Sequence, residues 1–233
     1  LLRRLGATFR LNDSGLNGGE RILPFDPLPR LISRRDWAQL ERGLLQRLEA
    51  IDCFLADVYG PQRILNDKVI PRQDVESSSG WRPQLQGIEL PLNRWCHISG
   101  LDLIRDGQGT WRVLEDNLRC PSGVAYFLEN RRVMKRLFPS LFEGRTVQPI
   151  DDYPSHLLRT LQDLAPWSDS PRVVILTPGV YNSAYFEHSY LAQQMGIPLV
   201  EGRDLICEDG RVWMQSTNGR RPVDVIYRRI DDD

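Results

Sequence analysis

Four strongly polar side chains lie within five positions of the stretch WRVLEDNLRCPSG, residues 111–123. They are Glu115, Asp116, Asn117 and Arg119, and they stand between an apolar run typical of a strand and a run typical of a helix. Carboxylate and amide oxygens are ligands that a hard cation such as Mg²⁺ prefers, and a guanidinium binds phosphate or carboxylate. The stretch therefore indicates metal-assisted chemistry on an anion.

The stretch includes the second strand of a predicted hairpin, RWCHISGLDLIRDGQGTWRVLEDN, which turns at DGQG. Either a four-residue loop or a two-residue turn places Asp102 opposite Val113 and diagonal to Glu115. Side chains alternate along a strand and cross-strand partners share a face, so we expect Asp102, Glu115 and Asn117 to project from one face. Asp116 then points the other way. An odd-length loop would instead move Asp102 to the opposite face.

These three oxygen-bearing side chains would repel one another unless a positive charge lay between them. Mg²⁺ fits, because it retains several waters and is commonly shared between carboxylates and substrate phosphates. The RCPSG turn that follows adds Arg119 and then Ser122, at the predicted start of a helix whose free N–H groups favour anions. Together these features predict phosphoryl chemistry. The alternative is a solvated hairpin face whose acids pair with Arg105 and Arg112, and the spacing alone does not choose between the two.

Two further stretches are candidate binding loops. The DSGLNGGERILPF segment could wrap a phosphate with backbone N–H groups while Arg21 adds charge, or it could be a tight loop that needs positive backbone angles. The TPGVYNSAYFEH turn follows a predicted strand and opens a helix, where α/β proteins often bind ligands. Its candidate substrate contacts are Asn182, Ser183 and Glu187. Alternatively, Ser183 caps the helix, and Glu187 with His188 lies on the helix surface.

The hydrophobic periodicity organises these loops into a mixed α/β architecture. A long helix begins at the N-cap Ser33 and closes at Gly60, a second runs from Ser122 to about Phe138, and a third spans 151–164. The strand RVVILTPG, the helix NSAYFEHSYLAQQMG and the strand PLVEGRDLI form one βαβ unit. A hairpin that turns at EDG follows, and then a final strand.

The composition is that of an ordinary globular protein, with 41% hydrophobic and 26% charged residues among 233. The net charge is -1 and the basic residues are interleaved with acids, which argues against a nucleic-acid patch or a polybasic membrane anchor. No apolar run reaches the roughly 18 residues of a membrane span, and the scattered cysteines form no CxxC pair. We therefore expect a cytoplasmic protein with small-molecule partners, no nucleic acid and no membrane.

Several longer stretches resemble one family. GGERILPFDPLPR, GLDLIRDGQGTWRVLEDNLRCPSG, LTPGVYNSAYFEHSYLAQQMG, LVEGRDL and VDVIYRRIDDD resemble the circularly permuted ATP-grasp type 2 proteins, relatives of glutathionylspermidine synthase. The resemblance implies a partial circularly permuted ATP-grasp fold, with residues 1–150 as the N-terminal part of the catalytic domain and 151–233 as a βαβ segment. It also implies an ATP- and Mg²⁺-dependent ligase that joins a carboxylate to an amine through an acyl phosphate. A peptide or small-molecule acid and an amine are the implied substrates.

The resemblance also implies functional residues. The family's metal pattern, an Asp on one strand and Glu-x-Asn on the next, falls on Asp102, Glu115 and Asn117. Arg119, Ser122 and Gly123 fall where the family places substrate or phosphate contacts. We assign Arg119 and Ser122 to catalysis, and Gly123 with Arg21 to nucleotide binding.

One departure from the family concerns the nucleotide clamp. ATP-grasp ligases hold ATP with lysines on strands, whereas Lys68 falls in a predicted loop and Lys135 in a predicted helix. Since the chain starts with Leu and stops abruptly at YRRIDDD, we expect a fragment without the clamp that binds ATP weakly and turns over nothing. The alternative is a non-catalytic ATP-grasp-like binding protein. A phosphoesterase is disfavoured, because neither histidines nor a second carboxylate cluster are available for a two-metal centre.

Overall fold

The computed structural model of this chain describes residues 7–10, 20–22 and 24–230. The chain divides into two compact units: unit 1 comprises Leu1–Pro29 and Ser122–Asp233, and unit 2 comprises Arg30–Pro121. Unit 2 is therefore inserted between the two segments of unit 1. The predicted division at residue 150 concerned roles in a longer ATP-grasp fold, and it stays a prediction.

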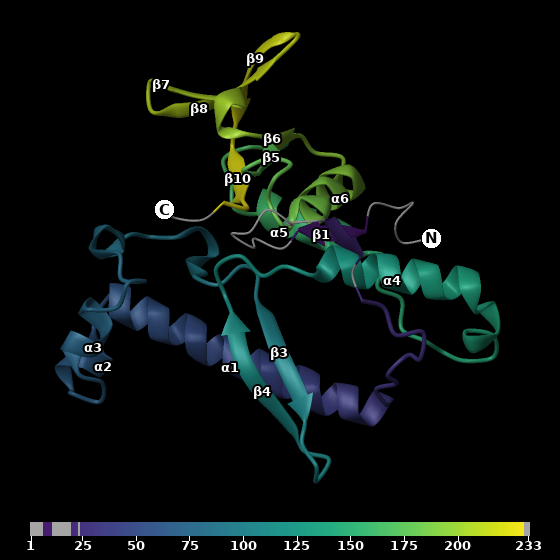
Figure 1. Cartoon of the computed structure of the whole chain (residues 1–233). Helices are drawn as coiled ribbons and strands as arrows, with labels where there is room; N and C mark the ends of the chain where they lie inside the picture. Colours follow the sequence, from purple (N-terminus) through teal and green to yellow (C-terminus); the bar gives the residue numbers. More distant parts are fainter. Residues whose placement is uncertain (1–6, 11–19, 23, 231–233) are drawn as a thin grey trace. The chain divides into compact units, whose positions relative to one another are not determined.

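Unit 2 contains one long helix, α1 (Arg34–Tyr59), whose ends lie where the sequence predicts them. The Ser33 hydroxyl accepts the Asp36 N–H and caps the start, and Gly60 follows the last turn. Strands β3 and β4 form the predicted antiparallel hairpin (Figure 1). The other elements of unit 2 have these bounds: α2 (Arg63–Asn66), α3 (Arg72–Glu76), the 3₁₀ turns Pro83–Leu85 and Pro91–Asn93, β3 (Gly100–Arg105) and β4 (Trp111–Asn117).

An aromatic stack anchors the connection between α1 and the hairpin. The Tyr59 ring lies between the indoles of Trp81 and Trp95, with ring centroids 4.8 and 4.9 Å apart and nearly parallel planes. The Tyr59 hydroxyl accepts the Arg82 N–H at 3.2 Å, and a carboxylate oxygen of Asp52 accepts the Trp95 N–H at 2.7 Å. These contacts hold the irregular segment after α1 against the last turns of the helix.

Unit 1 combines helices with three small sheets: β1–β2, the parallel sheet β10-β5-β6 and the antiparallel sheet β7-β8-β9. Its helical elements are α4 (Val124–Leu137), the 3₁₀ turn Pro139–Leu141, α5 (Tyr153–Gln162), α6 (Tyr185–Met195) and the 3₁₀ turn Gly202–Asp204. Its strands are β1 (Thr8–Arg10), β2 (Glu20–Ile22), β5 (Val173–Leu176), β6 (Leu199–Val200), β7 (Leu205–Glu208), β8 (Arg211–Ser216), β9 (Gly219–Val223) and β10 (Val225–Arg228).

The parallel sheet contains the predicted βαβ unit, β5–α6–β6, and β10 pairs with the other edge of β5. The predicted extent of its second strand is wrong. Glu201 and Asp204 form a capping box that bends the chain after β6, so the second half of PLVEGRDLI becomes β7 in a different sheet. The EDG turn joins β7 to β8, as the sequence predicts.

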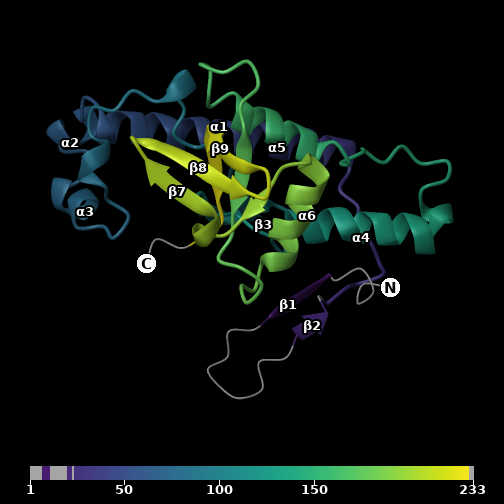
Figure 2. The same ribbon diagram turned by 90° about the horizontal axis from the view of Figure 1, so that it is seen from above.

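The parallel sheet is packed on both faces. On one face Val174 and Val200 are buried against Met214 of β8. Figure 1 shows the β7-β8-β9 sheet next to β5, β6 and β10, and Figure 2 shows the β7-β8-β9 sheet from above. The alternation of side chains turns Val173 and Ile175 to the other face, where α5 and α6 contact β5. This packing fixes the carboxyl ends of the three parallel strands at one edge of the sheet.

Candidate functional site

The turn of the β3–β4 hairpin has an odd number of residues, whereas the sequence predicts a four-residue loop or a two-residue turn. Arg105 pairs with Trp111, so the loop has five residues, 106–110. The Asp106 carboxylate organises it by accepting the N–H groups of Gln108 at 3.0 Å and Thr110 at 2.8 Å. The predicted pairing of Asp102 with Val113 is therefore wrong. An odd loop alone would place Asp102 and Glu115 on opposite faces.

A β-bulge at Leu114 reverses that effect. Leu103 pairs with Val113 but Asp102 pairs with Glu115, which leaves Leu114 as the extra residue of β4. Directly opposed residues share a face, with Cβ atoms about 4.5–5.5 Å apart. The two carboxylates thus come together through an odd loop combined with a bulge, which the sequence analysis did not foresee.

Asn117 completes the group on the same face. It lies two residues after Glu115 on β4, and its side-chain Nδ2 donates to Glu115 Oε1 at 3.1 Å. Its cross-strand partner is Gly100, where an added Cβ would lie 2.8 Å from Pro121 Cβ. A glycine is required there because the chain that leaves the hairpin passes this close to β3.

Asp116 points to the opposite face of the hairpin, as predicted. Its two carboxylate oxygens accept hydrogen bonds from Arg47 of α1, Oδ1 from Nε at 2.7 Å and Oδ2 from Nη2 at 2.6 Å. This paired hydrogen bond lowers the pKa of Asp116 below its usual value. The sequence analysis missed Arg47, because no local pattern links a helix residue to a strand so far along the chain.

The arginines considered as partners of the acidic face bind elsewhere. Arg112 pairs with Asp106 at 3.0 Å, and Arg105 lies 3.9 Å from Asp36 and donates to the Gly109 carbonyl at 2.9 Å. No group of three or more His, Cys, Asp or Glu residues suited to a metal occurs among the described residues. The hairpin offers two carboxylates and one amide, a set of oxygen donors that suits Mg²⁺ when waters or substrate complete the shell.

The start of α4 differs from the expected anion cradle. Gly123, with φ 113°, is the N-cap, and its N–H donates to Glu187 Oε2 at 2.7 Å. The Ala125 N–H donates to the same oxygen at 3.0 Å. Two of the N–H groups expected to receive phosphate therefore bind an internal carboxylate. Arg119, in unit 2, and Ser122, in unit 1, are both exposed.

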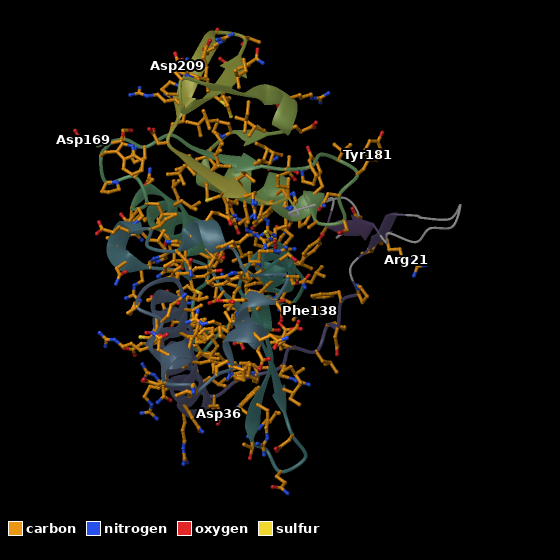
Figure 3. All side chains as sticks on the ribbon, turned by 90° about the vertical axis from the view of Figure 1, so that its left-hand side faces the viewer. Arg21, Asp36, Phe138, Asp169, Tyr181 and Asp209 are labelled. Carbon is orange, nitrogen blue, oxygen red and sulfur yellow. The ribbon has the colours of Figure 1, made fainter. Side chains whose placement is uncertain are left out.

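Of the predicted substrate contacts, Asn182 and Ser183 are half-buried in the loop between β5 and α6, next to the exposed Tyr181. Tyr181 is 80% exposed and projects outward (Figure 3). The expected surface position of Glu187 and His188 is wrong, since both are buried in α6. Ser183 is not the N-cap either. Ala184 has that position, and the Asn182 side-chain oxygen accepts the Ala184 N–H at 2.9 Å.

His188 is held neutral in this interior. The Thr177 hydroxyl oxygen lies 2.9 Å from His188 Nδ1 and accepts the Gly179 N–H at 3.2 Å, so its own hydrogen is available to the imidazole. Burial, reinforced by the positive charge of Arg229, lowers the pKa of His188 to about 4. His188 is therefore a neutral, buried side chain in the interior of unit 1.

Arg21 is exposed on β2, and Figure 3 shows its side chain pointing outward. Within the candidate phosphate loop, DSGLNGGERILPF, residues 13–19 and 23 lie outside the described residues. The structure therefore shows the Arg21 side chain of this predicted site, exposed on a short strand, but not the loop before it.

The sequence pattern of the circularly permuted ATP-grasp type 2 proteins matches residues 29–233. This chain belongs to that family. The match includes the hairpin with Asp102, Glu115 and Asn117 and the whole parallel sheet. The mixed α/β architecture with several small sheets is consistent with an ATP-grasp fold.

Relatives of this ATP-grasp chain are longer than the chain itself. An uncharacterized protein of Synechocystis sp. is 57% identical over 234 residues, 100% of this chain and 48% of the relative. An uncharacterized protein of Mycobacterium tuberculosis is 57% identical over 218 residues, 93% of this chain and 40% of the relative. A Frankia alni protein with the provisional name glutamate–cysteine ligase 2-3 is 41% identical over 232 residues, 98% of this chain and 26% of the relative. The chain spans about half of these relatives or less.

The two lysines of this ATP-grasp chain lie off the strands, as predicted. Lys68 is in the turn after α2, and Lys135 is in α4, where it pairs with Asp151 at 3.1 Å. Among the described helices, none combines the length and the apolar character that crossing a membrane requires.

Proposed function

We propose that this chain contributes the metal-ligand part of an ATP- and Mg²⁺-dependent carboxylate–amine ligase. The observation that carries the proposal is the pairing of Asp102 with Glu115 beside Asn117 on the face away from Arg47. Membership of the ATP-grasp family and the provisional ligase name of the Frankia relative support the reaction class. A cytoplasmic location, where ATP is abundant, is part of the proposal.

Asp102, Glu115 and Asn117 would hold the ion through carboxylate and amide oxygens. The Asn117 amide has a direct role in this arrangement, because it already contacts Glu115 and carries an oxygen as well as the donating nitrogen. When bound, Mg²⁺ would neutralise the phosphate charge of ATP.

The proposed reaction has two steps. A carboxylate oxygen of the acid attacks the γ-phosphorus of ATP and ADP leaves, which gives an acyl phosphate. The amine nitrogen then attacks the acyl carbon, phosphate leaves and the nitrogen loses a proton. We assign Arg119 to the transferring phosphoryl oxygens, because a guanidinium binds two of them at once and lies two residues after Asn117. Ser122, whose side chain is exposed, remains a candidate phosphate contact.

The substrate and nucleotide contacts are proposed with two residues fewer than predicted. Asn182 and Ser183 lie in the loop after the carboxyl end of β5, where α/β proteins bind ligands, and remain candidates for the acid or the amine. Arg21 remains a candidate for a nucleotide anion. Gly123 and Glu187 bind each other, so we remove both from the ligand contacts.

A Mg²⁺ titration of this chain by calorimetry tests the proposal. D102N and E115Q each remove one carboxylate charge without changing size, and each should weaken Mg²⁺ binding at least tenfold. E49Q, which makes the same change on the exposed surface of α1 in the same unit, should leave binding unchanged. Equal affinity in all four proteins would refute the metal site.

Turnover is tested separately, by assaying amide formation with this chain and with the full-length protein. The chain alone is expected to bind ATP weakly and to form no amide, since its lysines lie off the strands. Amide formation by the isolated chain would contradict this expectation. Nucleotide binding without amide formation by the full-length protein would favour the non-catalytic alternative.

A further inference from the structure

A single buried carboxylate joins three elements of unit 1. The Glu187 side chain is 0% exposed. Its Oε2 accepts the N–H groups of Gly123 and Ala125 at the start of α4, and its Oε1 accepts Arg229 Nη2 at 2.8 Å. Arg229 directly follows β10. Glu187 therefore ties the beginning of α4 to the end of β10, although these lie at opposite ends of the second segment of unit 1.

Arg229 is itself held in one position. Its Nη1 donates to the Tyr227 hydroxyl at 3.0 Å, its guanidinium lies over the Tyr227 ring at 5.4 Å, and its backbone N–H donates to the Leu176 carbonyl at 2.8 Å. The side chain is 3% exposed. The Glu187–Arg229 pair is thus fixed to the central strand of the parallel sheet.

Stability alone is a weak reason for such a pair. Removing two charges from water costs free energy, and apolar residues of similar volume often serve a protein interior equally well. The distinctive effect of this pair is on geometry. It holds Gly123 in a left-handed conformation and satisfies amides at the first turn of α4, which has no side-chain cap at its N-cap residue.

The turn at Gly123 closes a segment with a proposed role. Residues 118–122 connect Asn117 of the hairpin to α4 and contain Arg119 and Ser122. We propose that Glu187 and Arg229 are a positioning pair that orders this segment for nucleotide phosphate. The assignment rests on the proposed function as far as the phosphate is concerned. Whereas the sequence predicts that Glu187 contacts the substrate, in this proposal it positions the segment that does.

The test compares E187Q with H188Q in the full-length protein, because this chain alone is expected to bind ATP weakly. Gln at 187 keeps the size of the side chain but removes the charge that binds Arg229 and the α4 amides. H188Q changes the next residue of the same helix, which is buried to a similar degree but contacts Thr177. Each variant is measured three ways: amide hydrogen exchange of residues 118–125, affinity for Mg²⁺ alone, and affinity for ATP at saturating Mg²⁺.

We expect E187Q to raise amide exchange in residues 118–125 at least tenfold and to weaken ATP binding at least tenfold, with Mg²⁺ affinity unchanged. H188Q should change none of the three. Unchanged exchange in E187Q, or equal effects in both variants, would overturn the positioning role. If the unmodified protein failed to bind Mg²⁺, the proposed metal site would be refuted. The amide exchange data would still test whether Glu187 and Arg229 order residues 118–125.

The double variant E187M/R229M covers the case in which E187Q fails to fold. It removes both charges together and leaves no unpaired ion in the interior. We expect it to fold and to show the same rise in exchange and the same loss of ATP affinity as E187Q. A folded double variant with unchanged exchange in residues 118–125 would overturn the proposal.

Discussion

His188 shows how one buried side chain makes stability depend on pH. Its pKa is lowered to about 4 in the folded protein, by burial first and by the charge of Arg229 second, against about 6.5 in an unfolded chain. Between these two pKa values, the unfolded state therefore binds a proton at His188 and the folded state does not. The stabilisation is complete above about pH 6.5 and is lost as the pH falls toward about 4.

H188Q isolates this effect from that of the carboxylates. Between about pH 7 and pH 4 the unmodified chain should lose about 3 kcal/mol more unfolding free energy than H188Q, because the variant has no imidazole to titrate. Urea denaturation at a series of pH values measures the difference. Parallel pH profiles of the two proteins would contradict this expectation, because they would show that His188 has the same pKa in the folded and unfolded states.

For single residues, the sequence predicts which side chains share a strand face better than it predicts which side chains are buried. Glu115 and Asn117 share one face of β4 and Asp116 lies on the other, as predicted, because alternation along a strand is a local property. Asp102 joins Glu115 only through the five-residue loop and the bulge, which local alternation does not determine. The burial of Glu187 and His188 could not be read from their helix. The partners that make burial tolerable, Gly123, Thr177 and Arg229, all lie outside α6, at sequence separations of 64, 11 and 42 residues.

The β3–β4 hairpin and α1 form the element pair on which the candidate metal face depends. One face of the hairpin presents Asp102 and Glu115, and the other is attached to α1 through Asp116 and Arg47. The expectation of a common carboxylate face holds although the predicted register is wrong. The loop length and the bulge at Leu114 compensate for each other, and neither has a sequence signal as clear as an Asn-Gly turn.

A double-mutant cycle with R47Q and D116N tests this attachment. The coupling should be favourable at neutral pH and weaker at high salt, because Arg47 is solvent-accessible and its charge is screened. It should also fade as the pH falls below the ordinary carboxyl range and then through the lowered pKa of Asp116, since the protonated acid no longer pairs with Arg47. Unfolding free energies of the four proteins supply the cycle. A coupling of zero, or one insensitive to salt, would contradict the role of the ion pair.

On the scale of the whole molecule, the sequence predicts the element types and the family, while the structure adds the way distant segments combine. The long helix, the hairpin and the βαβ unit follow from periodicity and capping. The insertion of Arg30–Pro121 between the two segments of unit 1 does not. Such a division depends on contacts between residues far apart in sequence, which local patterns do not specify.

The candidate metal face on the hairpin can be located in this chain with Mn²⁺, which accepts the same oxygen ligands as Mg²⁺ and broadens nearby NMR signals. We expect substoichiometric Mn²⁺ to broaden the amide signals of 100–103 and 114–118 first, and the D102N/E115Q double variant to lose this effect. First broadening elsewhere, for example at the carboxyl edge of the parallel sheet, or unchanged broadening in the double variant would contradict this expectation.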